Sequence, residues 1–129
     1  MIFVFGSNLS GRHGAGAALT AYRLHGAKMG VAEGREGNSY AIPTVDHYIR
    51  STLPIPTIEK HVAHFIQYAK MLYEQSPQET FQITRVGCGL AGLRDHEIAP
   101  MFERAPITNC FIDQKWKIYL PKHESWGTF

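Results

Sequence analysis

The sequence has almost no excess of charge, few cysteines and no long apolar run. Its 129 residues include 13 lysines and arginines against 11 aspartates and glutamates, a formal net charge of +2. Because this excess is small and no basic run occurs, the composition does not indicate binding to nucleic acid or to an anionic membrane. No apolar stretch reaches the roughly 18 residues that a membrane-spanning helix needs. We therefore expect neither a nucleic-acid nor a membrane partner.

The two cysteines, Cys88 and Cys110, show neither the spacing of a metal site nor a disulfide framework. The apolar start of the chain, Met1 to Phe5, is too short for a secretory signal and has no basic flank. The sequence therefore predicts a cytoplasmic protein. Its length suits one domain with a real hydrophobic core, so a single domain is expected over residues 1–129. No cofactor or metal is expected, and the oligomeric state cannot be read from the sequence.

A strand, a glycine-rich loop and a helix follow one another at the start of the chain. The strand is the apolar run Met1 to Phe5, and the helix is expected to begin near Gly14 and to end before Gly26. The loop has four glycines within residues 6–16, an eleven-residue span, which let a ligand approach bare backbone. Loop N–H groups and a helix N-terminus together form an anion site, most often for phosphate. Arg12 adds a positive charge, although a tight turn without a ligand is the alternative interpretation.

A second loop of the same kind, Gly87 to Gly92, follows a predicted strand at 81–86. The carboxyl ends of parallel strands meet at one end of a sheet, so two such loops can clamp a diphosphate from both sides. Neither loop contains the lysine of a P-loop NTPase, which argues against that class. The residues predicted to bind the ligand are Gly6, Ser7, Asn8, Gly11, Arg12, His13, Gly14, Ala15 and Gly16 in the first loop, and Gly87, Cys88, Gly89, Leu90, Ala91 and Gly92 in the second.

The second loop also matches the G-x-G-x-x-G pattern of dinucleotide-binding proteins. Asp113 follows it at about the spacing of a ribose-binding acid. The pattern is short, however, and it lies late in the chain, where few residues remain for further βαβ units. A dinucleotide-dependent oxidoreductase is therefore an alternative interpretation.

Four side chains beside the loops are candidates for chemistry. Asn8 can bond to its own turn, and His13 can bind phosphate, transfer a proton or be an exposed loop histidine. Cys88 can be a thiol of lowered pKa or a small residue tolerated in a tight loop. Asp95 can act as a base or cap the helix that follows. The predicted catalytic residues are Asn8, His13 and Asp95, although no complete set of nucleophile, base and orienting group can be read from the sequence.

The rest of the chain alternates strands and helices, which predicts an α/β domain with a largely parallel sheet. The expected elements are an irregular stretch at 26–38, a strand at 40–42 that Pro43 ends, a helix from a Thr57 cap to about Gln75, a strand at 81–86, a helix at 96–104 capped by Asp95, and strands at 109–112 and 117–120.

Two histidines of the expected long helix, His61 and His64, lie one helical turn apart. A metal pair would need further ligands, and the sequence identifies none. We interpret these histidines as residues of the polar face of a surface helix.

The arrangement resembles the macrodomain superfamily, whose members bind ADP-ribose and related nucleotides. In that family a strand ends in asparagine and leads into a glycine-rich loop and an alanine-rich helix, as in Phe5-Gly6-Ser7-Asn8-Leu9 and Gly11-Arg12-His13-Gly14-Ala15-Gly16-Ala17-Ala18. A later family loop closes on the diphosphate, as in Arg85-Val86-Gly87-Cys88-Gly89-Leu90-Ala91-Gly92. The resemblance implies a three-layer α/β/α, macrodomain-like fold with a largely parallel mixed sheet. It also implies that Asn8, the matched asparagine, orients a ribose. Macrodomains usually also carry an earlier strand ending in Gly-Asp that contacts adenine. This sequence has no such aspartate, so the resemblance does not extend to adenine recognition.

More closely, the chain resembles a small family common in phages and prophages, over most of residues 2–121. The shared motifs are Phe-Gly-Ser-Asn-Leu at 5–9, Gly-Asn-Ser-Tyr-Ala-Ile-Pro-Thr at 37–44 and Gly-Cys-Gly-Leu-Ala-Gly at 87–92. The resemblance implies binding of an ADP-ribose-like or other diphosphate-containing nucleotide, with hydrolysis of an ADP-ribosyl bond as a candidate activity. The alternative is a non-enzymatic phage or prophage accessory protein that sequesters a signalling nucleotide or binds a host protein.

Overall fold

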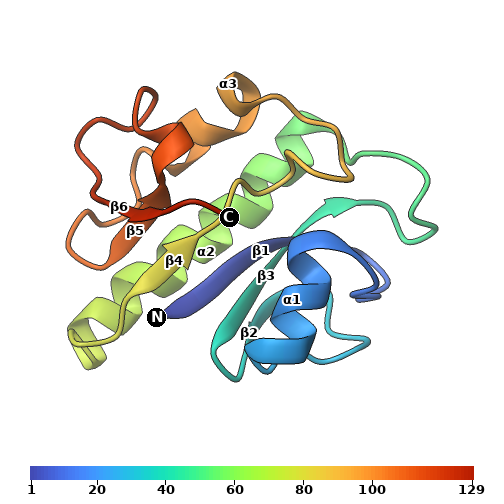
Figure 1. The fold of residues 1–129 in the computed structure, drawn as a ribbon, viewed down its shortest axis with the longest axis horizontal. Coiled ribbons are helices and arrows are strands. Elements are labelled where there is room, and N and C mark those ends of the chain that lie inside the picture. The colour runs from blue at the N-terminus through green and yellow to red at the C-terminus, as the bar shows by residue number, and fades with distance from the viewer.

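A six-stranded mixed sheet forms the centre of the computed structural model, which describes residues 1–129. Its order is β2-β3-β1-β4-β5-β6, and every neighbouring pair is parallel except β2 with β3. The predicted α/β class and largely parallel sheet are confirmed. The strands are β1 (Ile2–Asn8), β2 (Gly34–Glu36), β3 (Ser39–Val45), β4 (Phe81–Ile83), β5 (Cys110–Asp113) and β6 (Ser125–Gly127), and the α-helices are α1 (Gly16–Leu24), α2 (Ile55–Gln75) and α3 (Asp95–Ile98) (Figure 1).

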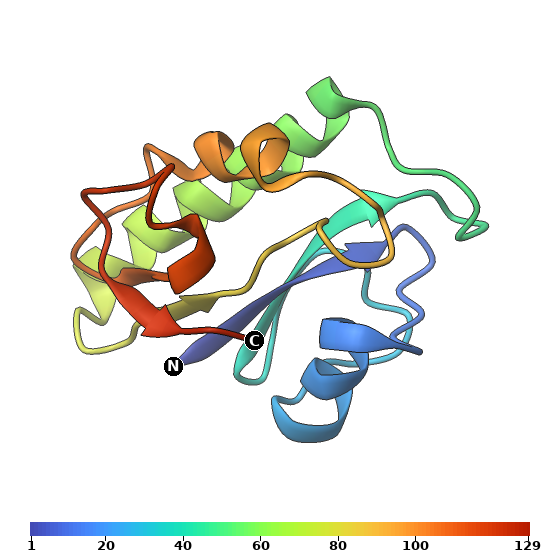
Figure 2. The same ribbon diagram turned by 45° about the horizontal axis from the view of Figure 1, so that its top comes forward.

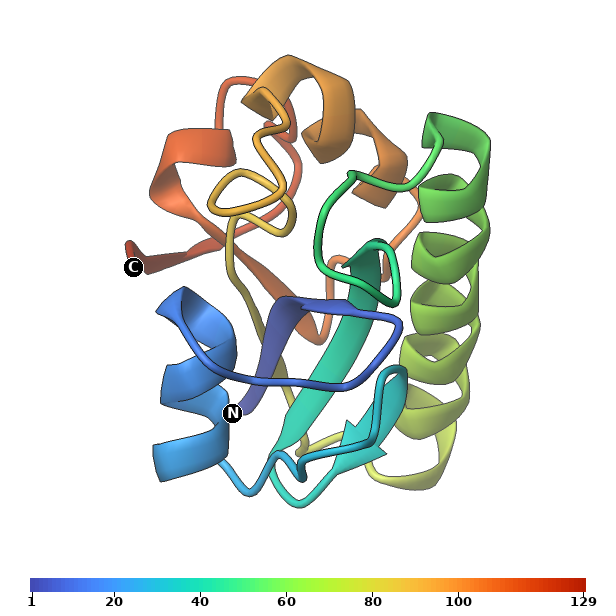
Figure 3. The same cartoon turned by 90° about the vertical axis from the view of Figure 1, so that its right-hand side faces the viewer.

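Strand β1 is buried on both faces, and its side chains alternate between two hydrophobic clusters. Ile2 and Val4 belong to the larger cluster with α2, whereas Phe3 and Phe5 belong to a smaller one with Ala21 of α1. Since successive side chains of a strand point to opposite faces, the two helices cover opposite faces of the sheet. Figure 3 shows α1 and α2 on either side of the strands. Burial on both faces explains why this strand is a continuous apolar run in the sequence.

Helix α2, which the sequence predicted to end at about Gln75, buries one face at helical spacing through Ile58, Val62, Phe65, Ala69 and Leu72. The helix begins at Ile55, however, and Pro54 rather than Thr57 occupies the position before it. Proline suits the start of a helix because the first N–H groups have no partner within the helix. The predicted Thr57 cap is therefore wrong by three residues. No helix of the structure combines the length and the apolar character needed to cross a membrane.

Pro43 lies inside β3 and does not end it, contrary to the prediction. It pairs with Ser7 of β1, while β2 on the other side of β3 reaches only from Ser39 to Ala41. At Pro43 that side of β3 has no neighbouring strand, so the missing N–H breaks no ladder bond. The longer strand carries Thr44 to the end of the sheet where β1 also ends.

The stretch predicted to be irregular at 26–38 contains strand β2. Arg35 pairs with Tyr40 and Glu36 pairs with Ser39 in a short antiparallel ladder. The two residues between the strands, Gly37 and Asn38, are a recognised hairpin signal that the sequence interpretation passed over. Because β2 has only three residues, it shows no alternating pattern of apolar and polar residues. The Gly37-Asn38 pair was therefore the only local signal for this strand.

The C-terminal part also differs from the prediction. Instead of a strand at 117–120, the chain forms the 3₁₀ turn η2 (Gln114–Trp116) and further turns after it. Asp113 caps η2 by accepting a hydrogen bond from the Lys115 N–H at 2.9 Å. The last strand is β6, and beyond it Phe129 packs edge-on against Phe3 with ring centroids 5.7 Å apart. Figure 2 shows the two ends of the chain near one another beside β1.

Candidate functional site

The two glycine loops leave the carboxyl ends of β1 and β4, which are parallel neighbours, so they lie at the same end of the sheet, as predicted. Figure 3 looks onto this end, where the segments that follow β1, β3 and β4 come together. Between them lies a cavity of about 230 Å³. Its lining consists of Gly6, Ser7, Asn8, Arg12 and residues 14–18 from the first loop and α1, Thr44, Val45 and Ile49 from the end of β3 and the turn after it, and Thr84, Arg85, Gly87, Gly89, Leu90 and Ala91 after β4.

The first loop carries unpaired backbone N–H groups along this cavity. The first hydrogen bond of α1 runs from the Leu19 N–H to the carbonyl oxygen of Ala15, at 3.1 Å. The N–H groups of residues 14–18, all of which line the cavity, have no acceptor within the protein. No acidic residue lies in the first turn, and Ala15 offers no side-chain cap. This helix end therefore keeps its donors and its positive partial charge for an anion.

The second loop divides its N–H groups between the protein and the cavity. Cys88 donates to the Arg85 carbonyl and Gly92 to the Gly89 carbonyl, both at 3.0 Å, and neither Cys88 nor Gly92 lines the cavity. Within the loop, the N–H groups that have no acceptor are those of the residues that do line it, namely Gly87, Gly89, Leu90 and Ala91. The unpaired donors of both loops thus border a single cavity.

The charged side chains that line the cavity are basic. Arg12 and Arg85 line it, and no aspartate or glutamate does. Arg85 is neutralised by a two-bond ion pair with Asp95, in which Nε meets Oδ1 and Nη2 meets Oδ2, each at 2.8 Å. Arg12 is exposed and forms no ion pair. It is therefore the cation available to a ligand.

Asn8 ends β1 and lines the cavity, but its amide is engaged within the loop. Nδ2 donates to the Arg12 carbonyl at 2.8 Å, and Oδ1 accepts from the Arg12 N–H at 3.0 Å. Oδ1 also accepts from the Ser10 hydroxyl at 2.7 Å. These bonds support the interpretation of Asn8 as a turn asparagine, which fixes the loop on which Arg12 stands.

His13 is fully buried, so the alternative interpretation of an exposed loop histidine is wrong. Its Nε2 lies 3.0 Å from the Lys28 carbonyl oxygen, and its ring packs edge-on against Phe5. It does not line the cavity. Gly11 also lies outside the cavity, and its carbonyl accepts from the Gly30 N–H at 2.9 Å. Both residues hold the first loop against the segment that follows α1.

Cys88 is not an activated thiol. Burial raises the pKa of Cys88 to about 12, and its hydrogen bond to Oδ1 of Asp95, at 3.4 Å, adds to the shift. A nucleophilic cysteine needs the opposite shift. The structure therefore favours the interpretation of Cys88 as a small residue packed in a tight loop.

Asp95 is the first residue of α3 rather than its cap, and its carboxylate accepts several hydrogen bonds. Besides the two bonds from Arg85 and the one from Cys88, Trp116 Nε1 donates to Oδ1 at 2.7 Å. The Arg85 hydrogen bonds are the largest of the causes that lower the pKa of Asp95 to about 2. Asp95 does not line the cavity. A carboxylate with these partners and this pKa is poorly suited to act as a base near neutral pH.

Asp95 is expected to make the fold sensitive to acid. Because its pKa of about 2 lies below the ordinary value of 3.8, the ionised carboxylate stabilises the fold above about pH 4, and this stability is lost as the pH falls toward 2. Asp95→Asn should lower the free energy of unfolding at pH 7 by about 1–2 kcal/mol, a figure reduced for partial exposure. It should also flatten the decline below pH 4.

Urea unfolding at several pH values measures this effect. Glu103→Gln, at an exposed position without an ion pair, is the matched control and should behave like the wild type. Equal unfolding free energies of the wild type and Asp95→Asn at pH 7 would contradict the role assigned to this carboxylate.

Asp113, the acid predicted to bind a ribose in the oxidoreductase alternative, already accepts hydrogen bonds from other groups of the protein. It is fully buried and accepts from the Lys115 N–H, the Thr128 hydroxyl and the Phe129 N–H at 2.9–3.0 Å. The second loop also leads into α3, which has only four residues. A dinucleotide-binding motif needs a full helix at this place, so the geometry disfavours that alternative.

The sequence interpretation missed the contribution of β3 to the cavity. Thr44, Val45 and Ile49 line the cavity together with the two loops. Ile49 has a φ of 59°, which is rare for a β-branched residue, and its turn is held by the Arg50 N–H bonded to Oδ1 of Asp46 at 2.8 Å. Because β3 is a parallel neighbour of β1, the residues that follow it reach the same end of the sheet. This rule could have predicted from the sequence that the residues after β3 join the site.

No protein-family model matches the chain, and neither the curated proteins nor the solved structures contain a significant match to it. The function therefore has to be inferred from the cavity itself.

Proposed function

We propose that the protein binds an ADP-ribose-like or other diphosphate-containing nucleotide between its two glycine loops. The observation that supports this most is the coincidence of unpaired N–H groups with the cavity lining, at residues 14–18 in one loop and at Gly87, Gly89, Leu90 and Ala91 in the other. Backbone donors on two sides, one of them a helix N-terminus, suit two phosphate groups. Arg12 supplies the balancing charge.

The size of the cavity limits how much of such a ligand it encloses. About 230 Å³ is less than the roughly 300–1,000 Å³ of typical small-molecule pockets. It has room for the phosphates and part of a sugar, and the rest of the nucleotide would lie over the rim, where Leu90 is 79% exposed. We therefore expect the affinity to depend mainly on the phosphates and the sugar beside them.

The proposal extends to a macrodomain-like arrangement of three layers, α/β/α. It is supported by α1 and α2 on opposite faces of the sheet and by the two glycine loops at one end of it. Strand β3 also contributes to the cavity wall, through Thr44 and Val45.

We favour binding without turnover over ADP-ribosyl hydrolysis. Among the residues predicted to be catalytic, Asn8 and Asp95 are engaged within the protein and His13 is buried outside the cavity. The hydroxyl groups along the cavity are engaged as well: they donate to carbonyl oxygens of Ala32 (Ser7), Ser7 (Thr44) and Val4 (Thr84). This lining is best suited to a protein that holds or sequesters a nucleotide. No side chain of the lining is placed as a free base.

Calorimetry with ADP-ribose, ADP, AMP and pyrophosphate tests the proposal. ADP-ribose and ADP should bind more tightly than AMP, because AMP lacks the second phosphate. Incubation with an ADP-ribosylated protein should release no ADP-ribose. Failure of all four ligands to bind at millimolar concentration would overturn the proposal, and catalytic release of ADP-ribose would replace the binder with a hydrolase.

Arg12→Gln is expected to weaken ADP-ribose binding by about tenfold, because it removes a charge-assisted contact worth about 1.5 kcal/mol. The fold should be unaffected, since the side chain is exposed. Arg23→Gln, in the last turn of α1, makes the same charge change at the far end of that helix and serves as the control. Equal losses in the two variants would show that only the net charge of the protein matters.

A further inference from the structure

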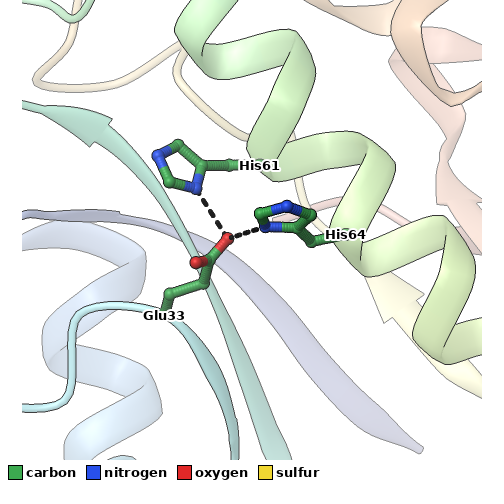
Figure 4. Close-up of side chains that lie close together, drawn as sticks. All are labelled: Glu33, His61 and His64. Atoms are coloured by element: carbon green, nitrogen blue, oxygen red, sulfur yellow. Dashed lines mark hydrogen bonds and ion pairs between the residues drawn. The ribbon is translucent and has the colours of Figure 1, made fainter.

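Three side chains with metal-binding atoms meet outside the proposed nucleotide cavity. Glu33 precedes β2, and His61 and His64 lie on α2 (Figure 4). Oε2 of Glu33 lies 2.6 Å from Nδ1 of His61 and 3.1 Å from Nδ1 of His64. One ligand atom from each residue lies within 4.8 Å of the other two. Both rings therefore turn the same nitrogen toward one carboxylate oxygen.

We propose that Glu33, His61 and His64 form a site for a divalent transition metal, with Zn²⁺ as the best fit. Two imidazole nitrogens and one carboxylate oxygen suit Zn²⁺, Co²⁺ or Ni²⁺, whereas Ca²⁺ and Mg²⁺ prefer oxygen alone. Tetrahedral coordination at about 2.0–2.2 Å places ligand atoms roughly 3.4 Å apart. The two observed nitrogen–oxygen distances would then lengthen by less than about 1 Å, which small rotations of the side chains provide.

The cluster is accessible to an ion. The side chains of His61, His64 and Glu33 are 15%, 48% and 31% exposed, respectively. Three protein ligands leave one tetrahedral position for water or for an atom of another ligand. An exposed rim over a partly buried histidine is an arrangement in which the ion can enter without unfolding of the chain.

Neighbouring bonds hold the ligands in place. Arg35, two residues after Glu33, donates to the Tyr68 hydroxyl at 3.1 Å and to Glu79 at 3.0 Å. Tyr68 lies on α2 one turn after His64, so the chain from Glu33 to Arg35 is fixed along the same side of the helix. These contacts do not involve the metal-binding atoms. They hold the segment in place before the metal binds, so less conformational entropy is lost on binding.

The metal site would also stabilise the segment that contacts the first glycine loop on the side away from the cavity. The Gly30 N–H donates to the Gly11 carbonyl at 2.9 Å, and the Ser7 hydroxyl donates to the Ala32 carbonyl. Ser7 lines the cavity, and Glu33 directly follows Ala32. A metal ion bound to Glu33 would therefore fix the segment against which the first glycine loop rests.

Chelator-treated protein titrated with Co²⁺ and then Zn²⁺ tests the site without any nucleotide. One equivalent of Co²⁺ per chain should bind and give the intense visible absorption of a four-coordinate ion, and Zn²⁺ should displace it. Glu33→Gln and His64→Gln should each weaken Zn²⁺ binding by more than about tenfold, because each removes one of three ligands. His96→Gln, at an exposed position on α3, is the control and should bind Zn²⁺ like the wild type.

The melting temperature gives a second readout. Saturating Zn²⁺ should raise it for the wild type and for His96→Gln, but not for the two ligand variants, because only ligand-bound native protein gains stability. His64 is half exposed, so its replacement should leave the fold intact, which circular dichroism checks. Absence of saturable Zn²⁺ binding, or equal affinity in the wild type and the ligand variants, would overturn the site and leave a hydrogen-bonded cluster. Since no nucleotide is present, this outcome is independent of the proposed function.

Discussion

Replacing Gly89 with valine is expected to weaken ADP-ribose binding by more than about tenfold, or about 1.4 kcal/mol, while the melting temperature stays the same. Gly89 lines the cavity, and its N–H has no acceptor within the protein. A Cβ atom at this position meets no atom within 4 Å, and the φ of Gly89 is not positive. The loop can therefore accept a side chain, and that side chain would occupy space next to the proposed phosphate.

Gly92→Ala in the same loop should show the opposite pattern. Gly92 does not line the cavity, but its φ of 76° is in the region that favours glycine. Alanine there should cost about 1 kcal/mol of stability and leave the affinity within about twofold. Calorimetry and thermal unfolding of both variants separate the two effects. Unchanged affinity in folded Gly89→Val would remove this loop from the binding site.

Gly11→Ala is expected to destabilise the fold by about 3 kcal/mol, through overpacking and backbone strain. Gly11 has a φ of 68°, and a Cβ atom on it would lie 2.5 Å from the Gly30 carbonyl carbon and 2.6 Å from the Val31 nitrogen. Both are backbone atoms, so no side-chain rotation can relieve the clash. For a chain of this length the melting temperature should fall by about 10 °C.

Gly14→Ala is the matched control for this loss of stability. Gly14 stands in the same loop, but a Cβ atom there meets nothing within 4 Å, and its φ is not positive. Its melting temperature should stay within about 2 °C of the wild type, because neither strain nor overlap arises. A melting temperature of Gly11→Ala equal to that of Gly14→Ala would show that the contact between Gly11 and Gly30 does not constrain the fold.

The sequence was informative where local chemistry decided the structure. The apolar run of β1, the helical spacing of α2 and the glycines after β1 and β4 are local patterns, and each predicted its element. The rule that parallel strands end together then placed both loops at one end of the sheet. Hydrophobic periodicity did not reveal β2 or the turns after Asp113, because three-residue strands and 3₁₀ turns carry almost no periodic signal. For β2 the local signal was the Gly37-Asn38 hairpin pair.

The roles of individual side chains depended on contacts with distant parts of the chain. The sequence left Asn8, His13, Cys88 and Asp95 each with more than one interpretation. Asn8 is resolved by neighbours in its own loop, Ser10 and Arg12, whereas the partners that resolve His13 and Asp95 cannot be read from a linear pattern. Lys28 approaches His13, and Arg85 and Trp116 approach Asp95. Burial raised the pKa of Cys88 to about 12, whereas position in a glycine loop suggested a lowered value.

By itself, the sequence determined an α/β chain with two glycine loops whose backbones are open to a ligand. Only the tertiary structure decided which residues of the second loop border the cavity and keep an unpaired N–H, as Gly89 does, and which bond within the loop, as Gly92 does. Likewise, His61 and His64 became a candidate metal site only when the fold brought Glu33 to them from a different element. The physical reason is the same in both cases: periodicity and spacing specify local backbone structure, whereas a site is made of atoms that folding brings together from far along the chain.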